Sequence, residues 1–255
     1  MRPTLLLLPG MLCDHVFWRA QCEALADLCT PCVVSYGLAD SIDKMAERVL
    51  SAGPASFALA GHSMGGRVAL EVVKRAPERV ERLGLFCTDY RGHESEAART
   101  VEAMSRERLL ANARESGMAN LARRWFVSQI AAAQAANAEL IRTMTAMGAR
   151  HSLQQLEAEF SAGLNRQDYA HLLAAISCPT LVCAAELDWL RPVGGHIQMA
   201  ARIPHARLIV IEGSGHMVAM ERPDALTAAM RDWLTAAERD PTDRHDEPLK
   251  DDACH

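Results

Sequence analysis

Apolar residues along the chain fall into two alternating patterns, which together predict a layered α/β protein. Short apolar runs predict six strands, at residues 4–8, 32–36, 56–60, 82–88, 180–184 and 207–211. Around these runs, apolar residues recur every three or four positions, which is typical of helices with one buried face. Such alternation predicts a mostly parallel sheet with helices on both of its faces.

Three helices in the first half of the chain have recognisable features. Ser41 is expected to cap one helix, and Asp14 is expected to cap an earlier one. A third helix is predicted at residues 64–76, where Glu71 and Arg75 are expected to form an ion pair on the outer face.

The pattern changes between residues 90 and 175, where no strand is predicted and Ala-, Arg- and Glu-rich helical segments follow one another. We therefore divide the chain into a core at 1–89 and 176–237, a helical cap inserted at 90–175, and a charged tail at 238–255. The tail lacks any periodicity, and we expect it to be disordered.

Net charge and hydropathy exclude several classes of protein. The net charge of −5 gives no electrostatic reason to bind nucleic acid or an anionic membrane. The apolar run at 4–8 is too short for a signal peptide, and no segment approaches the roughly 20 apolar residues of a membrane helix. We therefore expect a cytoplasmic protein with neither nucleic acid nor a membrane as its partner.

Eight cysteines are present without the paired spacing of a zinc site. Cys29 and Cys32 form a lone CxxC that could be a redox pair, but no second cluster supports this. We interpret the cysteines as small core residues in a reducing compartment. The histidines show no ligand spacing either, so no metal site is predicted.

A possible nucleophile follows the third predicted strand directly. Gly61-His62-Ser63-Met64-Gly65 has the form Gly-x-Ser-x-Gly, which makes a tight turn between a strand and a helix and exposes the serine. A serine hydroxyl needs a base to accept its proton and an acid to orient that base. Asp188 follows the fifth strand and His216 follows the sixth, in the order expected on such a sheet. Asp89 and Glu186 remain as alternatives for the acid.

Taken together, these motifs resemble those of the α/β-hydrolase superfamily. The resemblance rests on Leu7-Leu8-Pro9-Gly10-Met11, the serine motif, Glu186-Leu187-Asp188 and Gly213-Ser214-Gly215-His216, and it covers the core but not the cap. It implies an α/β-hydrolase fold whose usual first hairpin is absent. It also implies an oxyanion hole formed by the backbone N–H groups of Met11 and Met64.

The substrate pocket is less well defined by the sequence. Four residues are expected to bind substrate: Leu12, Trp125, Trp189 and Met217. Cys13 is either a further pocket residue or a small buried filler. The arginines at positions 106, 108, 114, 123 and 124 alternate with glutamates, which favours a solvated helix face over a docking site for an acidic acyl carrier.

The expected function is a serine hydrolase that cleaves a carboxylic ester of a small or medium acyl substrate through an acyl-enzyme, with no cofactor. The same three residues also fit hydrolysis of a thioester or of a C–C bond in a diketone, perhydrolysis, or cyanohydrin cleavage. A ligand receptor built on this fold is the non-enzymatic alternative. The oligomeric state is not predicted.

Overall fold

The computed structural model describes residues 2–236, and the tail expected at 238–255 lies outside them. Six strands form one sheet: β1 (Thr4–Leu8), β2 (Thr30–Val33), β3 (Phe57–His62), β4 (Val80–Phe86), β5 (Thr180–Ala185) and β6 (Ala206–Ile211). Their order is β2-β1-β3-β4-β5-β6, and every neighbouring pair is parallel. The predicted parallel sheet is confirmed, and no antiparallel hairpin precedes β1 within the described residues.

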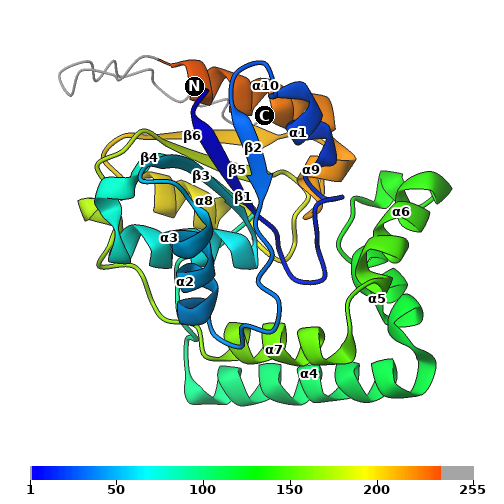
Figure 1. Ribbon diagram of the computed structural model, residues 1–255. Helices are drawn as coiled ribbons and strands as arrows, with labels where there is room; N and C mark the ends of the chain where they lie inside the picture. The colour runs from blue at the N-terminus through cyan, green and yellow to red at the C-terminus, as the bar shows by residue number, and fades with distance from the viewer. Residues whose placement is uncertain (1, 237–255) are drawn as a thin grey trace, which may run out of the picture.

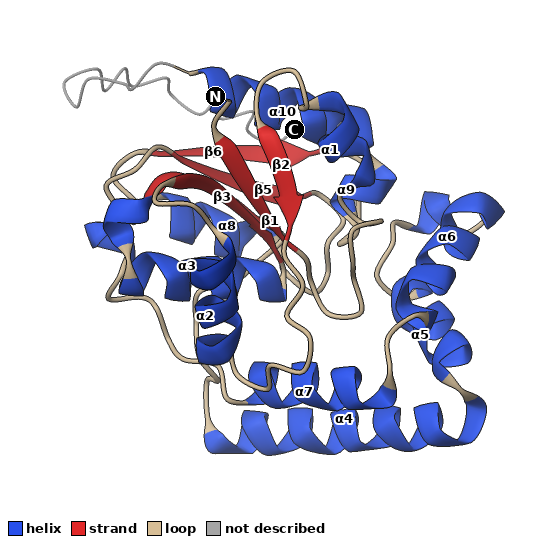
Figure 2. Ribbon diagram, viewed as in Figure 1, coloured by secondary structure: helices blue, strands red, loops and turns tan. Residues whose placement is uncertain are grey.

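Helices cover both faces of this sheet (Figures 1 and 2). One face packs against α2 (Ile42–Ala52), α3 (Met64–Arg75) and α8 (Val193–Ala200). The other packs against α1 (Arg19–Ala24), α9 (Val218–Glu221) and α10 (Pro223–Thr235). The central strands β3 and β5 are buried at every position, as expected for parallel strands covered on both sides.

All regular structure between β4 and β5 is helical, in the segment for which we predict a cap. It consists of α4 (Glu96–Ser116), α5 (Met118–Val127), α6 (Ala138–Ala149) and α7 (Leu153–Leu164). Short 3₁₀ turns lie at Pro77–Arg79, Ala132–Gln134 and Leu173–Ala175. Figure 1 shows α4 and α7 side by side beyond the ends of the strands, with α5 and α6 beside them.

Three local predictions were wrong. The second strand begins at Thr30 and ends at Val33, because its pairing with β1 starts opposite Thr4. Asp14 caps no helix: its carboxylate accepts the Val16 N–H in a turn, and α1 begins only at Arg19. Glu71 forms the expected ion pair with Arg75 at 2.8 Å but is not on an outer face, because the Tyr169 hydroxyl covers it and donates a hydrogen bond of 3.0 Å to its carboxylate.

None of the helices in residues 2–236 is long and apolar enough to cross a membrane. In the same range, no group of three or more His, Cys, Asp or Glu side chains is arranged to hold a metal ion. The seven described cysteines are free thiols; Cys29 is buried and Cys32 is exposed on β2.

Candidate active site

Ser63 lies at the turn between β3 and α3, in a backbone conformation that side chains rarely adopt. Its φ is 53° and its ψ is −115°, so the turn stores strain. The flanking glycines permit the turn, because a Cβ at Gly61 would lie 2.2 Å from the Gly65 carbonyl oxygen. The Thr88 hydroxyl donates to the Ser63 carbonyl at 2.6 Å and helps to fix the turn.

The structure brings Ser63, His216 and Asp188 together in one chain of hydrogen bonds. His216 Nε2 lies 3.0 Å from Ser63 Oγ, and His216 Nδ1 lies 2.7 Å from Asp188 Oδ2. The three residues follow β3, β6 and β5, whose carboxyl ends meet at one edge of the sheet. Such an arrangement lets the imidazole accept the serine proton while the carboxylate stabilises the resulting cation.

Asp188 is held in its charged form although its side chain is fully buried. Burial raises its pKa, but the hydrogen bond and the charge of His216 outweigh this and leave the pKa below its usual value. The two rival acids have other partners. Asp89 accepts the Arg91 N–H and lies 3.5 Å from Arg67, while Glu186 accepts the Gly213 N–H at 2.7 Å.

The loop that carries His216 is attached both to the cap and to α9. The His216 N–H donates to the Gln129 carbonyl at 2.8 Å. The Glu221 carboxylate accepts the N–H groups of Ala131, Gly215 and Met217 at 2.8–3.0 Å. This buried carboxylate therefore joins the segment after α5 to both neighbours of His216. No local motif in the sequence marks Glu221 for this role.

The loop after β1 passes close to Ser63. A Cβ at Gly10 would lie 2.8 Å from His62 and 3.3 Å from the Ser63 Cβ, so only glycine fits there. Neither Met11 nor Met64 donates its N–H to another backbone carbonyl in the described part of the chain. Two such unused donors are what an oxyanion hole requires.

Leu12 was expected to bind substrate but does not line the cavity. Its side chain is fully buried in the core, and its φ is 58°. Its N–H donates to the Glu159 carboxylate of α7 at 2.9 Å. Glu159 thus connects the cap to the loop after β1, and burial raises its pKa to about 8. A lone glutamate within a helix gives no sequence signal of this contact.

His62 lies beside Ser63 but fits a packing role. Its Nε2 lies 2.9 Å from the His216 carbonyl oxygen, and its ring packs against Phe17. Burial, together with the nearby charge of His216, lowers its pKa to about 3. A neutral imidazole that donates from Nε2 is not placed to act as a second base for Ser63.

A cavity of about 830 Å³ opens over Ser63 between the core and the cap. Three of the four expected substrate-binding residues line it: Trp125, Trp189 and Met217. Cys13 lines it as well. The exposed Trp189 links the two parts by donating its ring N–H to the Ser128 carbonyl at 2.7 Å.

The expectation that the cap arginines form only a solvated face was partly wrong. The half-buried Arg106 and the exposed Arg123 and Arg124 line the cavity, whereas the exposed Arg108 and Arg114 do not. The helical periodicity of α4 is weak in this polar segment, so the side facing the cavity could not be read from it.

Comparison with known proteins adds a family and several relatives. The family described as alpha/beta hydrolase fold matches residues 34–223. A Klebsiella pneumoniae protein named "Putative carbamate hydrolase RutD" is 26% identical, covering 92% of both chains. A pimeloyl-acyl-carrier-protein methyl ester esterase from Vibrio parahaemolyticus is 25% identical, covering 91% of this chain and 94% of the relative.

Two solved structures have a fold similar to that of this chain. A thermophilic esterase from Thermogutta terrifontis is 26% identical with a TM-score of 0.78, covering 91% of this chain and 89% of the esterase. The enol-lactonase from Burkholderia xenovorans shares the fold. It is 21% identical, with a TM-score of 0.77, and the match covers 92% of both chains.

Proposed function

The chain belongs to the alpha/beta hydrolase fold family, and from this premise we propose that it is a serine hydrolase that cleaves carboxylic esters. The observation that carries the proposal is the hydrogen-bonded chain from Ser63 through His216 to Asp188, placed at the wall of the cavity. The names of the relatives, which are hydrolases and esterases, favour this chemistry over a ligand receptor.

In the first half of the reaction, Ser63 Oγ attacks the ester carbonyl carbon as His216 Nε2 accepts the hydroxyl proton. The carbonyl oxygen becomes an oxyanion, which the N–H groups of Met11 and Met64 stabilise. Asp188 stabilises the imidazolium and keeps Nδ1 protonated. His216 then donates its proton to the departing alkoxide, and the acyl group remains on Ser63.

In the second half, a water molecule takes the place of the alcohol. His216 accepts a proton from this water, whose oxygen attacks the acyl-enzyme carbonyl, and the same two N–H groups stabilise the second oxyanion. Collapse returns the proton to Ser63 Oγ and releases the carboxylic acid. The overall reaction consumes one water and needs no cofactor.

A substrate panel tests the bond type. We expect p-nitrophenyl esters of graded chain length to be hydrolysed, with activity lost in Ser63→Ala and kept in Ser116→Ala, which changes an exposed serine of α4. An acyl thioester, a diketone and an aryl carbamate are measured beside them, the last because of the RutD relatives. Turnover that depends on Ser63 but occurs only outside the oxygen esters would show that the proposed bond type is wrong.

A further inference from the structure

Among the described residues, six arginines and one carboxylate line the cavity over Ser63. The arginines are Arg67, Arg106, Arg123, Arg124, Arg166 and Arg191, and the carboxylate belongs to Glu102. The whole chain carries a net charge of −5, so this local excess of positive charge runs against its overall balance. A cavity lined in this way attracts anions.

Four of these arginines form an inner cluster: Arg67, Arg106, Arg166 and Arg191. Their charges act on one another. Burial, together with the charges of the nearby Arg191 and Arg166, lowers the pKa of Arg67 to about 9. Burial also lowers the pKa of Arg106, and Arg166 and Arg191 again contribute. Each guanidinium of the inner cluster is therefore close enough to feel the repulsion of others.

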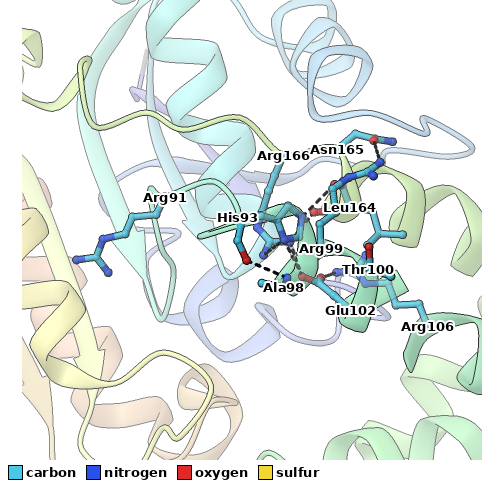
Figure 3. A network of polar contacts seen from close by, with 12 residues as sticks. Arg91, His93, Ala98, Arg99, Thr100, Glu102, Arg106, Leu164, Asn165 and Arg166 are labelled. Carbon is cyan, nitrogen blue, oxygen red and sulfur yellow. Dashed lines mark hydrogen bonds and ion pairs between the residues drawn. The ribbon is translucent and has the colours of Figure 1, made fainter. Parts of the chain in front are cut away.

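Two carboxylates compensate the inner cluster only in part. Glu102 pairs with Arg106, and it also pairs with Arg166 at 2.8 Å (Figure 3). Asp89 lies 3.5 Å from Arg67. Figure 3 also shows Arg91 extending away from Glu102 and Arg166, and its guanidinium donates to Gln198 instead.

Arg191 has no acidic partner in the described part of the chain. Its side chain donates to the Leu190 carbonyl at 2.8 Å, and its other guanidinium N–H groups have no acceptor there. The residue is half-buried, and its backbone N–H binds Asp188. This contact places Arg191 beside the proposed acid and at the cavity wall, where its free donors can reach a ligand.

Holding four buried or half-buried cations with two carboxylates is costly, because each charge has lost part of its hydration. A negatively charged ligand would offset this cost. Planar guanidinium groups bind a carboxylate through two parallel N–H donors, which gives orientation as well as affinity. The position next to Ser63 makes the substrate itself the most direct source of that charge.

We propose that the ester substrate carries a carboxylate group, which the inner arginine cluster binds while Ser63 attacks the ester carbonyl. The proposal rests on the proposed ester hydrolysis and adds the class of substrate. The carboxylate can belong to the acyl part or to the alcohol part, and the experiment separates these two sources.

Matched probes compare charge at constant size. For the acyl part, p-nitrophenyl hydrogen adipate is compared with the corresponding p-nitrophenyl adipamate, in which a neutral amide replaces the carboxylate. For the alcohol part, 4-carboxyphenyl butyrate is compared with 4-carbamoylphenyl butyrate. In one of the two pairs we expect the carboxylate probe to have a kcat/KM about tenfold to a hundredfold higher, as for a charge-assisted hydrogen bond.

Two variants change this ratio in opposite directions. Arg191→Gln removes the cation without an acidic partner and is expected to reduce the carboxylate-to-amide ratio about tenfold. Glu102→Gln removes the competing carboxylate and is expected to increase the ratio. Arg108→Gln removes one exposed arginine of α4 outside the cavity and serves as the charge-matched control. Because a ratio is measured, a general loss of folded protein cancels.

The outcomes separate this inference from the proposed function. In one outcome, the amide probes show turnover that depends on Ser63, and both carboxylate probes are slower than their amide partners. This result would overturn the inference and leave ester hydrolysis intact. A preference unchanged in Arg191→Gln and Glu102→Gln would also overturn it. If none of the four probes shows turnover that depends on Ser63, both proposals are overturned.

Discussion

The Asp188 carboxylate accepts three hydrogen bonds that serve different purposes. Oδ2 accepts the His216 Nδ1–H, while Oδ1 accepts the backbone N–H groups of Leu190 and Arg191 at 2.9 and 3.0 Å. The two backbone donors fix the carboxylate, so that Oδ2 points at the imidazole. An amide in its place would present an N–H or a weaker acceptor to Nδ1 and favour the wrong tautomer.

Replacing Asp188 tests this assignment of the acid. We expect Asp188→Asn to lower kcat by about 10⁴, as the loss of the orienting acid does in a well-studied serine protease. Asp89→Asn is expected to lower kcat by less than about tenfold, because Asp89 contacts Arg91 and Arg67 rather than His216. A larger loss of kcat in Asp89→Asn would show that Asp89 is the acid.

Positions marked by a local motif or by the end of a predicted strand could be predicted from the sequence, and the contacts of isolated buried carboxylates could not. Ser63 stands in a five-residue pattern whose geometry requires glycines on both sides, so its position at the turn was readable. The Glu159 carboxylate accepts the Leu12 N–H, and the Glu221 carboxylate accepts the Ala131 N–H. Both donors are far from these glutamates in the sequence. The prediction that Leu12 binds substrate was wrong for the same reason, because the environment of Leu12 depends on α7.

At the scale of elements, the loop after β1 is held by a helix of the cap. The only side-chain acceptor of the Leu12 N–H within the described residues is the Glu159 carboxylate, which is buried among Cys13, Tyr36 and His151. The preceding residue, Met11, contributes the N–H proposed for the oxyanion hole. The position of α7 therefore affects the loop that carries Met11 beside Ser63.

Glu159 makes the stability of the protein depend on pH. Its pKa is about 8 in the folded protein against a usual value of 4.5, so the folded state binds more protons between these values. The stabilisation from the neutral carboxyl is fully present below about pH 4.5 and is lost as the pH rises through about 8. We therefore expect the unfolding free energy of the wild type to fall between pH 5 and pH 8 relative to Glu159→Gln.

Urea denaturation at several pH values measures this difference. Glu157→Gln changes an exposed carboxylate of the same helix and is expected to follow the wild type. Parallel pH profiles for the wild type and Glu159→Gln would contradict the raised pKa.

Element boundaries were predictable where local signals agree with the tertiary structure. Ser41 caps α2 as expected, since its hydroxyl accepts the Lys44 N–H at 3.2 Å. Asp14 has the same capping chemistry, but its carboxylate also pairs with Arg150 of the cap, and the chain forms a turn there instead. Glu71 is covered by Tyr169, a residue nearly 100 positions later, which a helical pattern cannot reveal.

At the scale of the whole molecule, the cap and core share one hydrophobic cluster. Phe126 and Phe160 of the cap belong to the same buried cluster as Phe86 and Trp18 of the core. Polar contacts such as His216 to Gln129 add to this connection. The cap is therefore expected to unfold together with the core, although the sequence pattern separates the two.

Truncating a cap side chain tests this coupling. Phe126→Ala is expected to lower the unfolding free energy of the whole protein by about 3–5 kcal/mol, because Phe126 is buried in the shared cluster. Met104→Ala, at an exposed position of α4, is expected to change it by less than about 0.5 kcal/mol. Transitions followed by far-UV circular dichroism and by tryptophan fluorescence should coincide; a separate early transition of the cap in either variant would contradict the coupling.

The account depends most on Ser63 as the nucleophile, and covalent labelling tests this most directly. The protein is treated with a fluorophosphonate, and the adduct is located by mass spectrometry of peptides. We expect one adduct in the wild type, on the peptide that contains Ser63, and none in Ser63→Ala or in wild-type protein unfolded before treatment. Labelling of Ser63→Ala at the wild-type rate, or an adduct on another residue, would contradict the central claim.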